Sequence, residues 1–191
     1  MIPIQDAVPS GKVPVMTIAL VVINAIWFAL ESIANLPSAT VARSPFAHPS
    51  GVHFFVNVLF LWLFGDNVEA RVGRWLFVLL YLASSAIGAY TAAAAAPAGL
   101  AIGIGATCAT SGVLGAYFVL LPKARVLMLV PSPAVLTEAP APFFLALWWV
   151  LQVATFVIAP RAQPALLWSL VAGFATGAAL ALIARRPVVW T

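Results

Sequence analysis

The hydropathy pattern along the chain consists of long apolar runs separated by short segments that carry charge, proline or glycine. A helix that spans a membrane needs about 20 predominantly apolar residues. The runs therefore predict six transmembrane helices, over residues 14–33, 53–65, 75–96, 106–121, 143–159 and 166–184. We expect an all-α polytopic membrane protein in which residues 1–191 form a single transmembrane domain.

The connecting segments differ in character. We interpret residues 1–13 as a short polar lead, 66–74 as a charged turn and 122–142 as a proline-rich loop. Segment 97–105 is apolar but rich in helix breakers, so we expect it to dip back into the membrane, and the short run after it is typical of a helix that starts inside the bilayer. We expect the first apolar run to be a retained helix and not a signal peptide, because further spans follow it.

Composition narrows the classes of function. Hydrophobic residues make up 64% of the chain and charged residues 7%, which is too little charge to cover a soluble domain. The formal net charge is +4, but the basic residues form no stripe or cluster of the kind that binds nucleic acid, so we expect no nucleic-acid partner. The single cysteine, Cys108, excludes an intrachain disulfide and a cysteine-rich metal site.

The basic residues predict the orientation in the membrane. Cytoplasmic loops carry an excess of lysine and arginine. With six spans and a cytoplasmic N-terminus, seven of the nine basic residues lie inside and only Arg43 and Arg161 lie outside. The seven are Lys12, Arg71, Arg74, Lys123, Arg125, Arg185 and Arg186. We therefore expect both termini of this integral membrane protein to be cytoplasmic.

Small residues form stripes on the fourth and sixth predicted spans. Such stripes let helix backbones approach closely in a membrane. The stripes consist of Ala106, Ala109, Gly112, Gly115 and Ala116 on one span and Gly173, Gly177 and Ala181 on the other. They indicate either helix packing alone or two helices that pack closely so that side chains meet across them.

Polar residues at membrane depth are costly and usually face the protein interior. They are Asn24, Glu31, His53, Asn57, Ser84, Ser85, Thr107, Ser111, Gln152, Ser169 and Thr176. His53 and Asn57 are four residues apart and therefore share one helix face. They could donate hydrogen bonds to an oxyanion, or they could bond to backbone carbonyls and to one another.

Several segments, in order along the chain, resemble the rhomboid intramembrane serine proteases. The run 47–57, with His48, His53 and Asn57, resembles the signature of that family's second helix. The stretch 61–73 is similar to its turn into the third helix, 112–117 to its fourth helix, 122–127 to the basic loop that follows, and 2–6 to the opening of many bacterial members. The resemblance covers nearly the whole chain, and it implies an integral protein of a bacterial cytoplasmic (inner) membrane.

The resemblance implies a rhomboid-like bundle of six transmembrane helices with a short fourth helix. It also implies hydrolysis of a peptide bond in or near the transmembrane helix of a substrate. His53 and Asn57 then stand at the oxyanion-hole positions. Structural roles are implied for His48, Glu69, Gly73, Gly112, Gly115, Gly173 and Gly177.

The chain departs from the family at the two catalytic positions. The family's Gly-x-Ser-Gly motif reads Gly105-Ala106-Thr107-Cys108, so Thr107 stands at the position of the nucleophile. The sixth-helix motif reads Ser169-Leu170 followed by Gly173 and Gly177, so Leu170 stands at the position of the histidine base. A hydroxyl needs an adjacent base to become a good nucleophile, and leucine accepts no proton. The methyl group of threonine and the added side chain of Cys108 further crowd the site.

These departures favour a pseudoprotease over an enzyme. On this hypothesis the protein binds transmembrane helices of other membrane proteins, as a client-binding factor or as a subunit of a larger membrane complex. The alternative is an active intramembrane serine endopeptidase with a divergent threonine nucleophile, Thr107. A small transporter or channel is a weaker alternative, because the sequence shows neither a ring of charge nor paired broken helices.

Three further hypotheses would give residues of this region a chemical role. His53 could serve as the base for Thr107, although it would then not be an oxyanion donor. Cys108 could be the nucleophile, although it lies about 100° around the helix from Thr107. His48 or His53 could bind a metal ion, haem or chlorophyll, but no carboxylate or thiolate accompanies them. We expect no cofactor and no metal.

Overall fold

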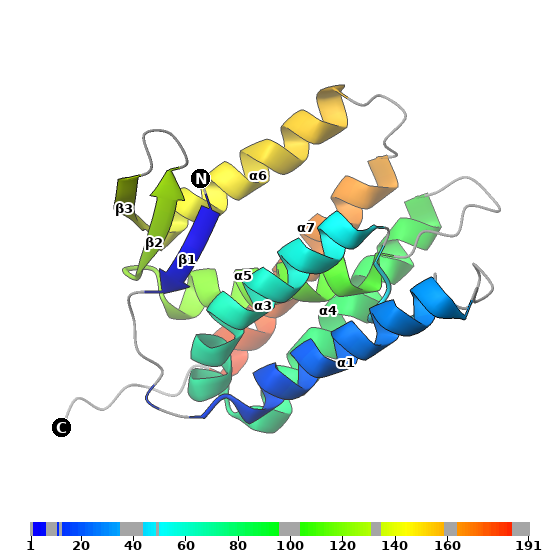
Figure 1. Ribbon diagram of the computed structural model, residues 1–191, viewed down its shortest axis with the longest axis horizontal. Helices are drawn as coiled ribbons and strands as arrows, with labels where there is room; N and C mark the ends of the chain where they lie inside the picture. The colour runs from blue at the N-terminus through cyan, green and yellow to red at the C-terminus, as the bar shows by residue number, and fades with distance from the viewer. Residues whose placement is uncertain are drawn as a thin grey trace.

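The computed structural model of the chain is a bundle of helices with a small sheet at one end (Figure 1). It describes residues 2–6, 11, 13–34, 44–48, 50–95, 104–130, 135–158 and 164–184. The helices of this part are α1 (Val15–Ile33), α3 (Gly51–Val72), α4 (Arg74–Ala95), α5 (Gly105–Leu120), α6 (Ala141–Ile158) and α7 (Pro164–Ala184). The predicted all-α polytopic class is confirmed.

Helix length separates the spans into two groups. Among the described residues, α1, α3, α4 and the Ala165–Ala184 part of α7 are long and apolar enough to cross a membrane. Helix α5 and the Ala141–Ala154 part of α6 are shorter apolar helices. The 16 residues of α5 rise about 24 Å, less than the hydrocarbon core of about 30 Å. The fourth helix is therefore short, as predicted.

The predicted charged turn over 66–74 is wrong, because α3 continues through most of it. The helix runs to Val72 and ends at Gly73, whose φ of 87° favours glycine. The polar side chains of this last part find partners within the fold. The Arg71 guanidinium donates to the backbone and side-chain oxygens of Asn67 at 3.0 and 2.8 Å. The charged residues of this segment therefore lie in the last turns of α3 and do not interrupt the helix.

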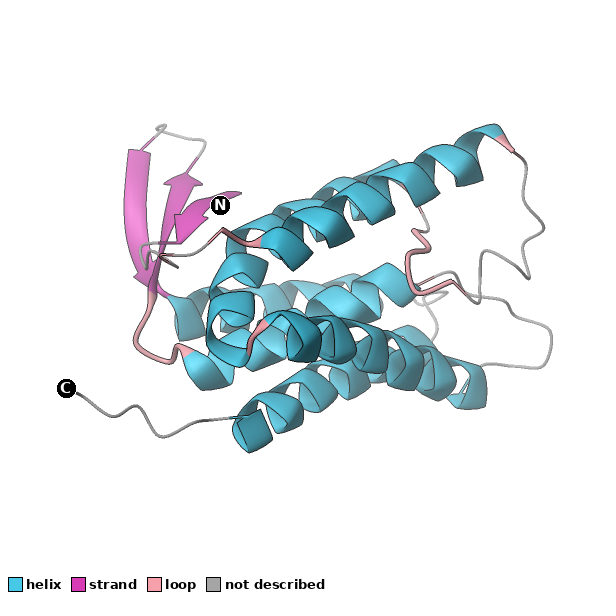
Figure 2. Ribbon diagram, turned by 90° about the horizontal axis from the view of Figure 1, so that it is seen from below, coloured by secondary structure: helices cyan, strands magenta, loops and turns pink. Residues whose placement is uncertain are grey.

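A three-stranded antiparallel sheet stands where we expected a polar lead and a proline-rich loop. The strands are β1 (Ile2–Asp6), β2 (Arg125–Val130) and β3 (Val135–Pro140), in the order β1-β2-β3. Val126 and Met128 alternate along β2 and are buried in the same core as the helices. Figure 2 shows the strands at one end of the bundle.

Helix α5 lies at the centre and packs tightly against α7. A Cβ added at Gly177 would lie 1.9 Å from the carbonyl oxygen of Gly112, and one at Gly173 would lie 2.5 Å from that of Cys108. Backbones approach this closely only where a side chain is absent. The close packing predicted for the fourth and sixth spans is therefore confirmed.

Within the part of α6 whose burial the structure describes, residues 141–154, the buried side chains all lie in the first half of the helix. Its inward stripe begins with Ala141, Leu145 and Trp148, which are all buried. From residue 149 to residue 154, no side chain is buried. The first half is held by Phe144, whose ring lies 5.8 Å from that of Phe60 and 5.7 Å from that of Phe64 on α3.

Candidate functional site

The site lies where the beginning of α3 meets the beginning of α5. Ser50 is the N-cap of α3, and its hydroxyl accepts a hydrogen bond from the backbone N–H of His53 at 3.4 Å. The same hydroxyl lies 2.8 Å from His53 Nδ1, which holds the ring against the first turn. Asn57 follows one turn later on the same helix face and is buried. Ser50 was not among the predicted site residues, although serine just before a helix is a common N-cap.

Thr107 is placed on α5 so that it alone of its segment reaches the surface. Every residue from Gly105 to Tyr117 is buried except Thr107, which is partly exposed. Its hydroxyl oxygen accepts a hydrogen bond from Asn57 Nδ2 at 2.9 Å. The expected meeting of Thr107 and Asn57 therefore exists, between side chains 50 residues apart.

The hydrogen bond on Thr107 has the wrong direction for activation. Asn57 Nδ2 is a donor, whereas a general base must accept the hydroxyl proton. Both histidines belong to the described residues, and neither ring forms a hydrogen bond with Thr107. What the arrangement can do is polarise or hold an oxygen atom at this position.

Leu170 lies beside the turn of α5 that begins with Thr107. Its backbone oxygen accepts a hydrogen bond from Ser111 Oγ at 2.9 Å, and Ser111 is one turn after Thr107. The side chain of Leu170 is buried and offers no atom that takes a proton. The structure thus brings the two degenerate positions to neighbouring turns of α5 and α7.

Cys108 points away from this polar surface and into the contact with α4. A Cβ added at Gly88 would lie 2.5 Å from Cys108 Cβ, and Cys108 is fully buried. The cysteine fills space between helices, which is a packing role.

His48 belongs to a segment that covers the beginning of α5. The ring is buried and makes edge contacts with Phe28 and Phe54, at centroid distances of 6.0 and 5.2 Å. Burial lowers the pKa of His48 to about 4, so the ring is neutral at pH 7. The neighbouring Ala47 carbonyl accepts from the Ala106 N–H at 3.4 Å. His48 therefore helps to seat residues 44–48 on α5.

The histidines do not form a metal site with other ligands in the part of the chain that the structure describes. That part holds no group of three or more histidine, cysteine, aspartate or glutamate side chains placed to bind a metal ion. Neither ring nitrogen of His48 has a hydrogen-bond partner there, but the two phenylalanine rings occupy the space beside it.

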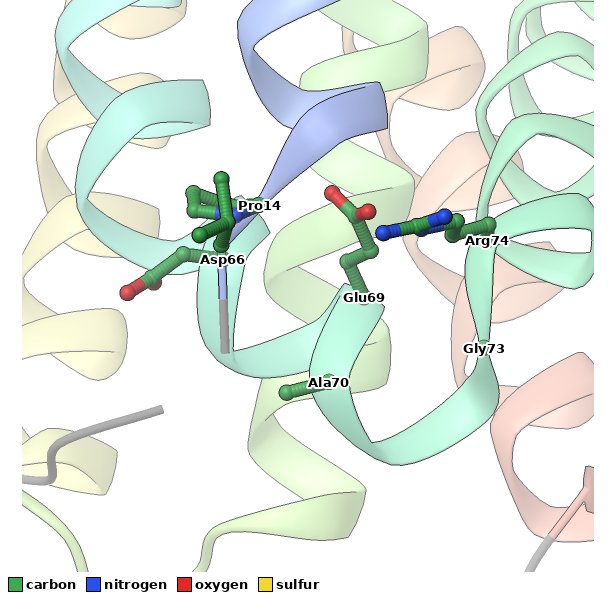
Figure 3. Close-up of a pocket in the computed structure, with 7 residues that line it drawn as sticks. Pro14, Asp66, Glu69, Ala70, Gly73 and Arg74 are labelled. Carbon is green, nitrogen blue, oxygen red and sulfur yellow. The ribbon is translucent and has the colours of Figure 1, made fainter. Parts of the chain in front are cut away.

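Glu69 joins α3 to the beginning of α1. Its carboxylate accepts hydrogen bonds from the backbone N–H groups of Met16 and Thr17, at 3.0 and 2.8 Å, and from the Thr17 hydroxyl at 2.9 Å. Pro14, the N-cap of α1, supplies no side-chain cap. A carboxylate is favourable at a helix N-terminus, so Glu69 caps α1 from another helix. Figure 3 shows Arg74 extending toward this carboxylate. Both residues line a pocket of about 470 Å³.

Glu69→Gln is expected to lower the free energy of unfolding by about 1–2 kcal/mol, because an amide presents a donor to N–H groups that need an acceptor. Unfolding by SDS in mixed micelles measures the change. Glu138→Gln is the matched control, since its ion pair with Arg125 is half exposed and contributes at most about 1 kcal/mol. Equal losses in the two variants would contradict the capping role.

Comparison with known proteins gives two matches. The model of the Rhomboid domain family matches residues 35–187. Among curated proteins, "Rhomboid protein 1, mitochondrial" of Saccharomyces cerevisiae is 34% identical over 99 residues, which cover 49% of this chain and 29% of that protein. The chain thus matches less than a third of the length of this relative. No solved structure matches the chain significantly.

Proposed function

Because this chain belongs to the rhomboid family, we propose that it is a rhomboid-like pseudoprotease that binds the transmembrane helices of other membrane proteins. It acts as a client-binding factor or as a subunit of a larger membrane complex. The proposal rests on two features. The chain has the integral membrane scaffold of the family, and its nucleophile and base positions carry neither a serine nor a histidine.

One observation carries the proposal. The Thr107 hydroxyl accepts a hydrogen bond from the Asn57 amide, and the residue at the base position beside it is Leu170. Attack on a peptide carbonyl requires removal of the hydroxyl proton, and neither side chain removes it. His53 is the nearest candidate by sequence, and its Nδ1 atom is engaged by Ser50.

The packing supports retention of a binding scaffold. Helices α5 and α7 keep their close backbone contacts at Gly112, Gly173 and Gly177. Val52, Phe55 and Val56 at the start of α3, and Val150, Leu151 and Val153 on α6, are exposed. An uncovered face in a bilayer is available to another helix.

The active endopeptidase stays as the second candidate, favoured by the partial exposure of Thr107 at an otherwise buried helix. In that case Thr107 is the nucleophile. Removal of its hydroxyl then abolishes cleavage, whereas a pseudoprotease shows no cleavage before or after this change.

The orientation with cytoplasmic termini, in a bacterial inner membrane, is part of the proposal. Successive helices run in opposite directions (Figure 1). Arg71, Arg74, Lys123 and Arg125 therefore gather at the end of the bundle that carries the sheet. This agrees with the positive-inside rule when that end is cytoplasmic.

The test compares the purified chain with its Thr107→Ala variant in proteoliposomes that contain a generic transmembrane substrate. We expect no cleavage above background from either, measured by gel and mass spectrometry, because the hydroxyl is not activated. Thr176→Ala, which removes a hydroxyl bonded within α7, is the matched control, and an active rhomboid protease assayed in parallel shows that the substrate is cleavable. Cleavage that disappears only in Thr107→Ala would establish the second candidate instead.

A further inference from the structure

A pocket of about 470 Å³ lies beside the last turns of α3, at the opposite end of that helix from the candidate site. Helix α3 lines it with Asp66, Glu69 and Gly73, which recur at intervals of three or four residues and share one face of the helix. Pro14 lines it from the start of α1, and Arg74 from the start of α4. Three parts of the chain therefore meet around this pocket (Figure 3).

The Arg74 guanidinium is the positive group of the pocket. Arg74 is exposed and extends toward the Glu69 carboxylate (Figure 3), but it forms no ion pair with the residues that the structure describes. Glu69 already accepts three hydrogen bonds from Met16 and Thr17, so the N-terminus of α1 offsets much of its charge. The guanidinium therefore keeps donors for a ligand, and their fork geometry suits a phosphate group.

The Asp66 carboxylate supplies negative charge at the other side of the pocket. Asp66 and Arg74 stand on opposite sides of Glu69 (Figure 3), and the helix rises about 10 Å from Asp66 to Gly73. Asp66 is half-buried, and its Oδ1 atom accepts a hydrogen bond from the Asn67 N–H at 2.6 Å. An ionised carboxylate accepts further donors as well. The pocket thus presents separated charges of opposite sign, which match a ligand with an ammonium at one end and a phosphate at the other.

The residues around the pocket favour a primary ammonium group. Aromatic rings are the usual partners of a quaternary ammonium, and the described residues that line the pocket include none. A primary ammonium instead donates hydrogen bonds, as lysine does, and carboxylate oxygens accept them. Two carboxylates stand beside one guanidinium, so a ligand that carries only negative charge is repelled. The pocket therefore suits a zwitterion of the phosphoethanolamine type.

The pocket lies at the level expected for lipid headgroups. Trp75 follows Arg74 and is 79% exposed, and tryptophan is enriched where a membrane meets water. Val15 and Ile18, just after Pro14, are exposed apolar side chains on the membrane span α1. A phospholipid can therefore place its headgroup in the pocket while its acyl chains lie along α1.

We propose that this pocket binds the headgroup of a phospholipid that carries a primary ammonium, such as phosphatidylethanolamine. Arg74 holds the phosphate, and Asp66 accepts hydrogen bonds from the ammonium. The bound lipid connects the start of α1 with the end of α3 and the start of α4. This inference goes beyond the proposed function, because it concerns a lipid at the opposite end of α3 from Thr107 and holds whether or not the chain is a protease.

The test measures lipid binding to the full chain in detergent micelles by native mass spectrometry. The chain is titrated with phosphatidylethanolamine, phosphatidylcholine and phosphatidylglycerol that carry the same acyl chains. We expect phosphatidylethanolamine to bind about 3- to 10-fold more tightly than the other two, the scale of one partly exposed charge contact. Arg74→Gln should weaken its binding by a similar factor, and Arg74→Lys, which keeps the charge, should retain part of it. Asp66→Asn should abolish the preference for ethanolamine over choline.

Lys123→Gln is the matched control, since it removes an exposed positive charge near the sheet that does not line the pocket. The preference should survive this change, and thermal unfolding of each variant shows that it is folded. Equal binding of the three lipids by the unaltered chain would overturn the proposal, as would a preference that persists in Arg74→Gln or in Asp66→Asn. Soluble glycerophosphoethanolamine should compete only weakly. Competition at the concentration of the lipid itself would overturn a membrane lipid as the occupant.

Discussion

A chain that carries Thr107→Ser, Cys108→Gly and Leu170→His together is expected to cleave a transmembrane substrate that the unaltered chain leaves intact. The histidine supplies the missing proton acceptor, and serine removes the methyl group that crowds the attack. Ser111 Oγ bonds the Leu170 backbone oxygen at 2.9 Å, so residue 170 already lies beside the turn that begins at residue 107. We expect a rate of cleavage about 10³-fold above the background measured without activity, the scale on which one catalytic partner acts.

The measurement is release of a labelled fragment in proteoliposomes, with thermal unfolding recorded for each variant. The variant with Thr107→Ser and Cys108→Gly but without Leu170→His is the decisive control, because it has a better nucleophile and still no base. It should remain inactive. Equal cleavage by the unaltered chain and the triple variant, or no cleavage by a triple variant that unfolds at an unchanged temperature, would contradict our account of the missing base.

Gly177→Ala is expected to lower the free energy of unfolding by about 3 kcal/mol, which is large for one methyl group. The new Cβ would lie 1.9 Å from the Gly112 oxygen and 2.7 Å from the Gly112 Cα. These are backbone atoms, so no side-chain rotation relieves the overlap and α5 and α7 must move apart. Unfolding by SDS in mixed micelles measures the loss.

Gly51→Ala is the matched control for this prediction. An added Cβ there would meet Phe28 Cζ at 3.7 Å, an ordinary contact, and alanine favours a helix more than glycine does. We expect stability to be unchanged or slightly higher. If the two variants lose stability equally, the cause is the general effect of changing a glycine and not the contact between α5 and α7.

The helices were predictable from sequence because their signal is local. Each apolar run identifies a span without knowledge of what it touches. The end of α3 and the three-stranded sheet were not, because both depend on distant partners. In the sequence alone, Glu69 and the charged residues around it predict a turn. The hydrogen bonds that Glu69 accepts from the beginning of α1 explain why the helix continues there. The strands contain or adjoin prolines, and β1 pairs with residues more than 100 positions away.

At the candidate site too, features that follow from local sequence were predictable, whereas contacts between distant residues were not. The shared face of His53 and Asn57 follows from helical spacing alone, and the structure agrees in placing Asn57 inward. The contact between Asn57 and Thr107, by contrast, needs the relative placement of α3 and α5. Gln152 was visible in the sequence as a polar residue at membrane depth. Only the structure shows that its side chain is half-buried.

The pairing of β1 with β2 has a consequence for biosynthesis. Asp6 ends β1 and Arg125 begins β2, so a ribosome that adds about 5–20 residues per second makes the second strand about 6–24 s after the first. During this interval α1, α3, α4 and α5 are synthesised while the first strand has no partner strand. The sheet therefore closes late, and its closure ties the segment before α1 to the hairpin that introduces α6.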